Sequence, residues 1–314
     1  MLHATTRTAV MDVIVQLVFF FMRPFLLVLA LASSTTLLAC DVCGCSIAGG
    51  GFGLLSGTTQ HFVGVSYTHL QYENEVAPVV DHFNRFQLTG QVQIKRRWRA
   101  QAVIPIVLNT RFDERAAALQ ANGIGDIQLL GSYALVDRLL DKGGRLLVTS
   151  GLGISLPTGA FDRQIFRRPL PEDFNPGRGA ATFIGEVRVQ ATKGNHGVLS
   201  VLRHETSSHN EANYRFGDRW LVLAKAYRRI KTKHVGLVPS LGLEYAHIAP
   251  NARRETGTEL HGSGGNTFNI SSGLQAERNN YAFGIEAALP ITQTFGNGDA
   301  LATPRLDVTL IRKF

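Results

Sequence analysis

The feature that most restricts how this chain can fold is an alternation of apolar and polar residues that recurs after Gly57. It is clear in FQLTGQVQIK (86–95), FIGEVRVQA (183–191) and RLDVTLIRKF (305–314). Successive side chains of a β-strand point to opposite faces of the sheet, whereas a helix repeats about every 3.6 residues. We therefore expect the chain after Gly57 to consist of β-strands, each with one apolar face, and we identify no convincing helical segment there.

The length of these segments separates a soluble sandwich from a transmembrane barrel. Strands of soluble proteins usually have about 5–6 residues, whereas a tilted strand that spans a bilayer needs about 9–11. In hydrocarbon only a closed barrel satisfies every backbone group of a sheet. The sequence predicts an all-β, closed antiparallel transmembrane barrel of twelve strands, at 59–73, 82–96, 97–109, 124–137, 143–157, 179–192, 195–207, 214–230, 234–248, 265–277, 280–290 and 302–314.

The connections between the predicted strands support the barrel independently. If the N-terminus is periplasmic, the outward loops lie at 74–81, 110–123, 158–178, 208–213, 249–264 and 291–301. The returning turns lie at 96–97, 138–142, 193–194, 231–233 and 278–279, and each is shorter than the loops beside it. Long external loops, short periplasmic turns and an even strand number are typical of outer-membrane barrels.

The end of the chain and its composition fit the same location. A terminal aromatic residue after an alternating strand, here Phe314, resembles the assembly signal of bacterial outer-membrane barrels, which implies the barrel-assembly machinery as a partner. Charged residues make up 18% of the chain, below the ~25% usual for soluble domains. The formal net charge is +8, but no basic block is long enough to indicate nucleic-acid binding. We predict location in the outer membrane of a Gram-negative bacterium, with membrane lipid around the barrel.

An export signal precedes the barrel. Arg23, the apolar run FLLVLALA and a stretch of small residues lead to Cys40, which is the layout of a signal peptide. The apolar run is too short to span a bilayer as a helix, unless translation starts at Met1 and the upstream apolar residues lengthen it. A start at Met22 or Met11 is the alternative that we favour. The predicted organisation is a signal peptide at 1–39, a Cys- and Gly-rich leader at 40–58 and a barrel at 59–314.

Three cysteines stand together at the start of the leader. LLAC (37–40) resembles a bacterial lipobox, which predicts acylation of Cys40; cleavage after Ala39 with three free thiols is the alternative. Cys43 and Cys45 would then form a Cys-Gly-Cys pair in an oxidising compartment. A disulfide between residues two apart is strained, so a soft ion such as Cu(I) is the cofactor to test there. Without copper, no cofactor is expected.

Two segments carry a family resemblance. GIGDIQLLGSYAL (123–135) and GLGISLPTGAFD (151–162) resemble paired signatures of outer-membrane transporters named after a gene of the phenol meta-cleavage pathway. In that family a Gly-Gly-Asp strand start, matched by Gly123, Gly125 and Asp126, is followed by a strand that ends in Leu-Pro-Thr-Gly, matched by 156–159. The resemblance implies a small barrel with a role in the passage of hydrophobic compounds. The Cys-rich leader is not part of the family's core pattern.

If the apolar stripe faces lipid, a set of ionisable side chains must face the lumen. The set comprises Arg85, Lys95, Arg99, Asp126, Glu186, Arg188, Arg203, Glu205, Glu244, Glu286 and Asp307. One interpretation is an interior in which Arg and Glu neutralise each other across strands. The other is a polar pathway for a solute, because twelve strands lie between the filled eight-stranded barrels and the open channels of sixteen to eighteen. The sequence is compatible with both.

Catalytic motifs are not evident, and we expect no enzymatic activity. HETSSH (204–209) differs from the zinc-protease motif because its histidines are five residues apart. GLGISLPTG (151–159) lacks the Gly-Lys-Ser/Thr ending of a phosphate-binding loop. The leading hypothesis is a lipid-anchored outer-membrane channel or transporter for a small solute. A copper-handling protein and a non-conducting structural or adhesive barrel are the alternatives.

The lipobox gives a direct prediction about the mature N-terminus. Mass spectrometry of the purified protein should show a chain that begins at Cys40 and carries the added mass of a diacylglycerol and a third acyl chain. A Cys40→Ser variant should lose that mass. A mature native protein with an unmodified Cys40 would contradict the prediction.

Overall fold

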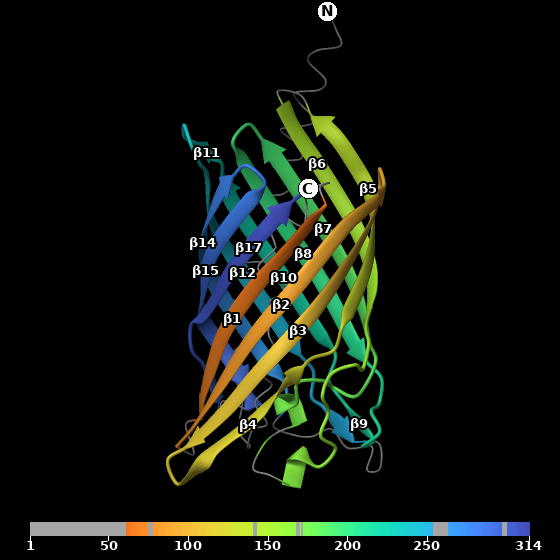
Figure 1. Ribbon diagram of the computed structural model, residues 1–314, viewed down its shortest axis with the longest axis vertical. Helices are drawn as coiled ribbons and strands as arrows, with labels where there is room; N and C mark the ends of the chain where they lie inside the picture. The colour runs from red at the N-terminus through yellow and green to blue at the C-terminus, as the bar shows by residue number, and fades with distance from the viewer. Residues whose placement is uncertain are drawn as a thin grey trace, which may run out of the picture. The chain divides into compact units, whose positions relative to one another are not determined.

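The computed structural model describes residues 61–74, 78–140, 143–167, 170, 172–253, 263–296 and 300–314. The predicted signal peptide (1–39), the leader (40–58) and with them Cys40, Cys43 and Cys45 lie outside the described residues. Nearly all of the described chain is β-structure, arranged as tilted strands around one axis (Figure 1). Among the described residues, no helix is long and apolar enough to cross a membrane.

Twelve antiparallel strand positions close into a barrel. Closure occurs where β1 pairs with β2 on one edge and with β17 on the other, Phe62 lying opposite Gln91 and Lys313. The prediction of a twelve-stranded closed barrel is therefore confirmed. The strands of the ring are β1 (Phe62–Asn74), β2 (Val79–Lys95), β3 (Trp98–Asp113), β5 (Gln128–Leu140), β6 (Gly144–Ser155), β7 (Thr182–Lys193), β8 (His196–Ser207), β10 (Arg219–Arg228), β12 (Gly236–Ile248), β14 (Gly265–Arg278), β15 (Tyr281–Phe295) and β17 (Arg305–Lys313).

Shorter strands extend the ring toward its loops. The short elements are β4 (Ala116–Ile124), β9 (Tyr214–Arg215), β11 (Ile230–Lys231), β13 (Ala252–Arg253) and β16 (Ala300–Ala302). β4 and β5 follow one another along the same edge of β3, and β16 and β17 do so along β1.

One expected loop is instead a hairpin. The sequence predicted an outward loop at 110–123, but β3 continues to Asp113 and turns into β4. Most side chains of β4, on both faces, are exposed or half-exposed. The more exposed face of β4 carries Ala118, Gln120 and Asn122 instead of a row of large apolar residues. The alternation that reveals the other strands is therefore missing here.

The residues that alternate along the sequence point alternately to the inside and the outside of the ring. Along β1, Phe62 and Ser66 are 2% and 1% exposed, whereas Val63 and Val65 are 45% and 48% exposed. All twelve strand positions contribute large apolar side chains to the exposed face. An apolar surface of this extent marks contact with a membrane, and the polar face of every strand lies inside.

The connections between strands are short at one end of the ring and longer at the other, as the sequence predicts. Short turns join β2 to β3, β5 to β6, β7 to β8 and β14 to β15 at one end. The turns include the positive-φ residues Gly143 and Asn279, a conformation that suits Gly and Asn. The longer connections lie at the opposite end, which we call the outer end. The last residue, Phe314, lies at the periplasmic end, where its N–H donates to the carbonyl of His61 at 2.9 Å.

The lipid-facing assignment predicts the cost of a charge on the outer face. Leu243 is 48% exposed near the middle of β12. Leu243→Arg should reduce the free energy of unfolding in lipid vesicles by about 2–4 kcal/mol, because the guanidinium would lie in hydrocarbon. His196 is the exposed first residue of β8, beside a periplasmic turn. The matched variant His196→Arg should cost about 0–1 kcal/mol. Equal losses from the two variants would contradict the assignment.

Candidate functional site

The interior of the barrel collects ionisable side chains from most of its strands. Arg85 is half-buried on β2, and Arg99 is 5% exposed on β3. Glu186 and Arg188 lie on β7, Arg203 and Glu205 on β8. Lys95 is exposed, because it is the last residue of β2 at the periplasmic end. Most of these groups join one of two clusters.

The first group, the Arg305 cluster, consists of Lys225, Glu244, Glu286, Arg305 and Asp307. The Arg305 guanidinium donates to both carboxylate oxygens of Glu244, at 2.9 and 3.1 Å, and to Asp307 at 2.7 Å. The Lys225 ammonium donates to Glu286 at 2.5 Å. β14 and β15 separate β12 from β17, so the pair between Arg305 and Glu244 bridges non-adjacent strands through the interior. These contacts place the five side chains inside the ring.

The Arg203 cluster consists of Gln128, Glu186, Arg188, Arg203 and Glu205. Arg203 donates to Glu205 at 2.9 Å, and its terminal nitrogen lies 3.6 Å from Glu186. Arg188 donates to Glu186 at 3.0 Å. A third donor of Arg203 reaches Gln128 on β5 at 3.1 Å, across the inner faces of β6 and β7. Each buried charge in this cluster has an opposite charge nearby, which offsets much of the cost of burial.

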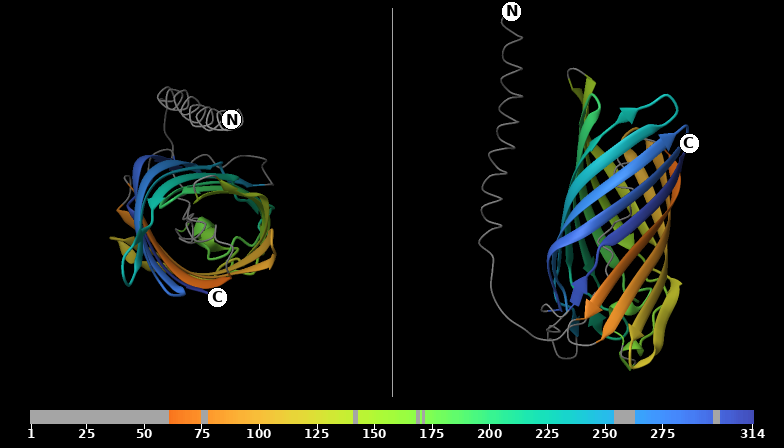
Figure 2. Two further views of the ribbon diagram at one scale, coloured as in Figure 1. Left: turned by 90° about the horizontal axis from the view of Figure 1, so that it is seen from above. Right: turned by 90° about the vertical axis from the view of Figure 1, so that its left-hand side faces the viewer.

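The described part of residues 156–181, between β6 and β7, folds into the outer mouth of the barrel; we call it the mouth segment. It contains two short 3₁₀ turns, η2 (Ile165–Arg167) and η3 (Glu172–Phe174). Seen along the barrel axis, they lie within the ring of strands (Figure 2). Ile165 and Phe174 are fully buried and share a hydrophobic cluster with barrel residues such as Tyr72. The mouth segment thus fills part of the lumen that its strands enclose.

Contacts to opposite walls hold the mouth segment in place. On one side, the Phe174 ring meets Phe83 edge-on at 5.3 Å, and Asn109 donates to the carbonyl of Phe174 at 2.9 Å. On the other side, Asn251 donates to the carboxylate of Asp173 at 3.2 Å. These contacts involve side chains, and the backbone hydrogen bonds to the wall occur near the ends of the segment, as from the N–H of Ala160 to the carbonyl of Ile124. The segment can therefore move with less loss of backbone hydrogen bonding than a strand can.

Asp126 fastens both ends of the mouth segment. One carboxylate oxygen accepts the N–H of Gly159 at 2.9 Å, and the other accepts the N–H of Arg178 at 2.8 Å. Gly159 and Gly177 touch so closely that a Cβ on either would lie 2.7 Å from the other's backbone. The Gly-Asp and Leu-Pro-Thr-Gly signatures therefore meet at one point. Sequence reasoning placed Asp126 on the inner face but missed this role, since the signal was only the shared occurrence of the two motifs.

The glycines of the first signature also permit close packing. A Cβ on Gly123 would approach Ala160 of the mouth segment to 2.9 Å. A Cβ on Gly125 would approach Pro105 to 2.9 Å and the carbonyl of Pro176 to 3.0 Å. The backbone of 123–125 can thus lie directly against the base of the segment.

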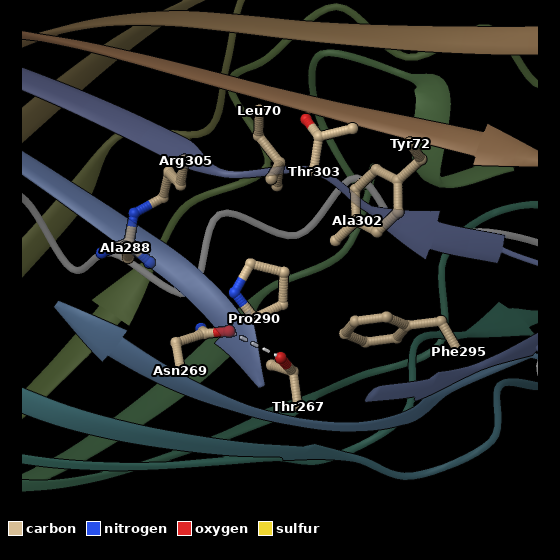
Figure 3. A pocket seen from close by; sticks show the side chains of 10 residues that line it. All are labelled: Leu70, Tyr72, Thr267, Asn269, Ala288, Pro290, Phe295, Ala302, Thr303 and Arg305. Atoms are coloured by element: carbon tan, nitrogen blue, oxygen red, sulfur yellow. Dashed lines mark hydrogen bonds between the residues drawn. The ribbon is translucent and has the colours of Figure 1, made fainter. Parts of the chain in front are cut away.

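A small cavity lies inside the wall formed by β1, β14, β15 and β16 (Figure 3). Its volume of about 20 Å³ is enough for about one water molecule. Leu70, Tyr72, Pro290 and Phe295 give it an apolar lining, and Arg305 closes it toward the Arg305 cluster. Its position is therefore between the apolar mouth and the charged interior.

Metal-ligating side chains do not converge in the part of the chain that the structure describes. His204 lies on the outer face of β8, where its ring is 4.2 Å from Trp220, and His209 follows the end of that strand. No group of three or more His, Cys, Asp or Glu side chains there could hold a metal ion. HETSSH (204–209) therefore forms no metal site with the other described residues.

Comparison with known proteins identifies the fold. The chain is similar to an outer membrane channel from Pseudomonas putida F1, with a TM-score of 0.64 and 15% identity over 86% of this chain and 100% of that one. The β domain of the Bordetella autotransporter BrkA gives a TM-score of 0.47 at 8% identity, over 81% of this chain and 100% of that one. No protein-family model and no curated protein matches the chain. The fold and the apolar exterior place the barrel in the outer membrane of a Gram-negative bacterium.

The Asp126 contacts predict a local change in protease sensitivity. Asp126→Asn keeps the shape of the side chain but places an NH₂ group against one of the two N–H donors. Trypsin cleavage after the exposed Arg163 should accelerate by about tenfold, because a hydrogen bond to a charged group contributes about 1.5–3 kcal/mol. Asp113→Asn is the control, since Asp113 accepts from the N–H of Arg115 outside the mouth segment. Unchanged cleavage in Asp126→Asn would contradict the role of Asp126.

Proposed function

We propose that the protein is an outer-membrane channel for small solutes, closed at its outer end by the mouth segment. The observation that carries the proposal is the position of that segment inside the ring. It is fastened at its base by Asp126 and by Arg178, which donates to Ser207 and pairs with Glu205. Side chains on opposite walls brace it. Its displacement would open the outer mouth without breaking the barrel.

The solute that we propose is small and apolar, such as an aromatic compound. The apolar side chains at the outer mouth support this choice. Leu70, Tyr72, Phe83 and Phe295 belong to the same buried cluster there as Phe174. A charged solute would lose hydration among these side chains, where the nearby charges of Arg111 and Asp81 already pair with each other. The resemblance of 123–135 and 151–162 to transporters named after phenol meta-cleavage agrees with this class, and we propose that the chain belongs with them.

A non-conducting barrel is the second candidate, and one observation favours it. The bridges from Arg305 to Glu244 and from Lys225 to Glu286 tie non-adjacent strands together inside the ring. Charges that neutralise each other in this way need no solute to satisfy them. In this alternative the loops at the outer end would carry the function.

Planar-bilayer recording tests the channel. The native protein should give discrete current steps that are infrequent, because the mouth segment is fastened. Asp126→Asn should raise the open probability by about tenfold with an unchanged step size, since a weaker fastening changes how often the mouth opens. Asp113→Asn should behave like the native protein. If neither the native protein nor Asp126→Asn gives current steps, the lumen is shut and the second candidate holds.

A further inference from the structure

The charged side chains at the periplasmic end of the barrel, the upper end in Figure 1, are mostly basic. The exposed ones form a set that we call the periplasmic rim: Lys95, Arg96, Arg97, Arg138, Lys193, Arg228, Arg229, Lys231, Lys233, Arg278 and Arg312. Among the described residues, the acidic side chains at this end are Asp137, paired with Arg145 at 2.8 Å, and Glu277, paired with Lys313 at 3.6 Å. Asp141, between β5 and β6, lies outside the described residues. The rim therefore carries a positive charge that the acidic groups described here do not offset.

The periplasmic rim surrounds the barrel. Its members come from the ends of β2, β5, β7, β10, β14 and β17 and from the turns beside them, and these strands are distributed around the whole ring. A site for a protein partner would gather the charges on one side, and a site for a solute would gather them at the lumen. A lipid leaflet contacts the barrel on every side, so this distribution fits the headgroup layer of the membrane.

Aromatic contacts place two of these cations at the margin of the apolar belt. The Arg312 guanidinium lies over the rings of Tyr281 and Phe314, 5.8 and 5.1 Å from their centroids. Arg97 donates to the Tyr133 hydroxyl at 3.5 Å. Trp and Tyr are enriched where hydrocarbon meets headgroups. A long basic side chain at this depth keeps its stem against apolar surface and its charge among the headgroups.

The outer margin of the belt has a different composition. Its outward-facing polar side chains on the ring strands include uncharged amides and imidazoles: His69, Asn84, His204, His247 and Asn266. The arginines of β3 and β10 at that end, Arg111 and Arg219, are largely buried and lie beside Asp81 and Asp173. The ring of exposed cations on the strands is therefore a feature of the side that faces the inner leaflet.

One row of the rim crosses three adjacent strands. Arg278 on β14 lies opposite Tyr281 on β15, and Tyr281 lies opposite Arg312 on β17. Opposite residues share a face of the sheet, and Tyr281 is 51% exposed, so all three side chains face outward. Strands are spaced about 4.8 Å apart, and two arginines that flank one strand can therefore reach the same phosphate group. The acidic neighbour Glu277 lies on the inner face, where it pairs with Lys313.

We propose that Arg278, Tyr281 and Arg312 form a binding site for the phosphate group of an anionic phospholipid, such as phosphatidylglycerol, in the inner leaflet. Each guanidinium can donate two N–H groups to phosphate oxygens, and the Tyr281 hydroxyl is a further donor. The rest of the periplasmic rim attracts the same lipids around the barrel. The site lies on the outer surface and goes beyond the proposed channel, since it holds whether or not the lumen conducts.

Quenching of tryptophan fluorescence by brominated lipids measures which lipid lies beside a chosen position. The chain has two tryptophans, and both are removed as Trp98→Phe and Trp220→Phe. Phe283→Trp then places a single reporter two residues from Tyr281 on the lipid-facing side of β15. The protein is folded into symmetric vesicles of phosphatidylcholine and phosphatidylglycerol, with one or the other lipid brominated. The ratio of the two quenching curves gives the preference for phosphatidylglycerol at the reporter.

The reporter protein should prefer phosphatidylglycerol. Arg278→Gln/Arg312→Gln should lower that preference on the order of fivefold, because basic residues beside an anionic leaflet account for the attraction. Sodium chloride at 1 M, which shortens the screening length to about 3 Å, should lower it in the unsubstituted reporter protein. An equal preference with and without the two arginines would overturn the site, as would the absence of any preference in the reporter protein.

Two controls separate a local site from a general effect of charge. Arg138→Gln removes a rim cation from β5, several strands away from β15, and should leave quenching at position 283 unchanged. A protein that keeps Trp220 as its single tryptophan reports on the outer margin, where Arg278→Gln/Arg312→Gln should have no effect. A loss of preference at position 283 as large in Arg138→Gln as in the double variant would overturn the assignment to Arg278 and Arg312.

Discussion

The structure depends on the need of every backbone N–H and C=O to find a partner where there is no water. A sheet in hydrocarbon satisfies that need only by closing on itself, and β1 completes the closure by pairing with both β2 and β17. Once the ring is closed, each strand has one face toward the membrane and one toward the interior. The period of two sends alternate side chains outward and inward. A band of Val, Leu, Ile and aromatic residues therefore covers the exterior, and the buried charges such as Glu244 and Arg305 lie within.

Confined charges must be paired, and the pairs organise the interior. Arg305 binds Glu244 and Asp307, and Arg203 lies against Glu186 and Glu205. Removing one partner of such a pair generally costs about 3–5 kcal/mol. At the outer end, the mouth segment is held by aromatic packing, by Asp126, and by the ion pairs of Arg178 with Glu205 and of Asp173 with Arg219. Continuous strand pairing holds the wall, whereas mainly side-chain contacts hold the mouth segment. The gated channel that we propose requires this difference.

The sequence predicted the features that depend on neighbours in the chain. Strand positions and the inner faces of β2, β7 and β17 follow from local alternation. Features built from distant contacts escaped it: Asp126 bonds residues 33 and 52 positions away. The sequence predicts a loop in place of the β3–β4 hairpin because the more exposed face of β4 carries Ala118, Gln120 and Asn122 instead of large apolar residues. The interrupted pairing between β15 and β16 depends on register, which one strand's sequence does not reveal.

The measurement that tests the account most directly is a spin-label scan along β12, one position at a time from 237 to 247. Accessibility to molecular oxygen, which concentrates in hydrocarbon, should peak at odd positions such as Leu241, Leu243 and Tyr245. It should fall at Gly242 and Glu244, giving a period of two. A scan without that period, or one in which a water-soluble nickel chelate reaches the odd positions best, would contradict a membrane-embedded barrel with its charges inside.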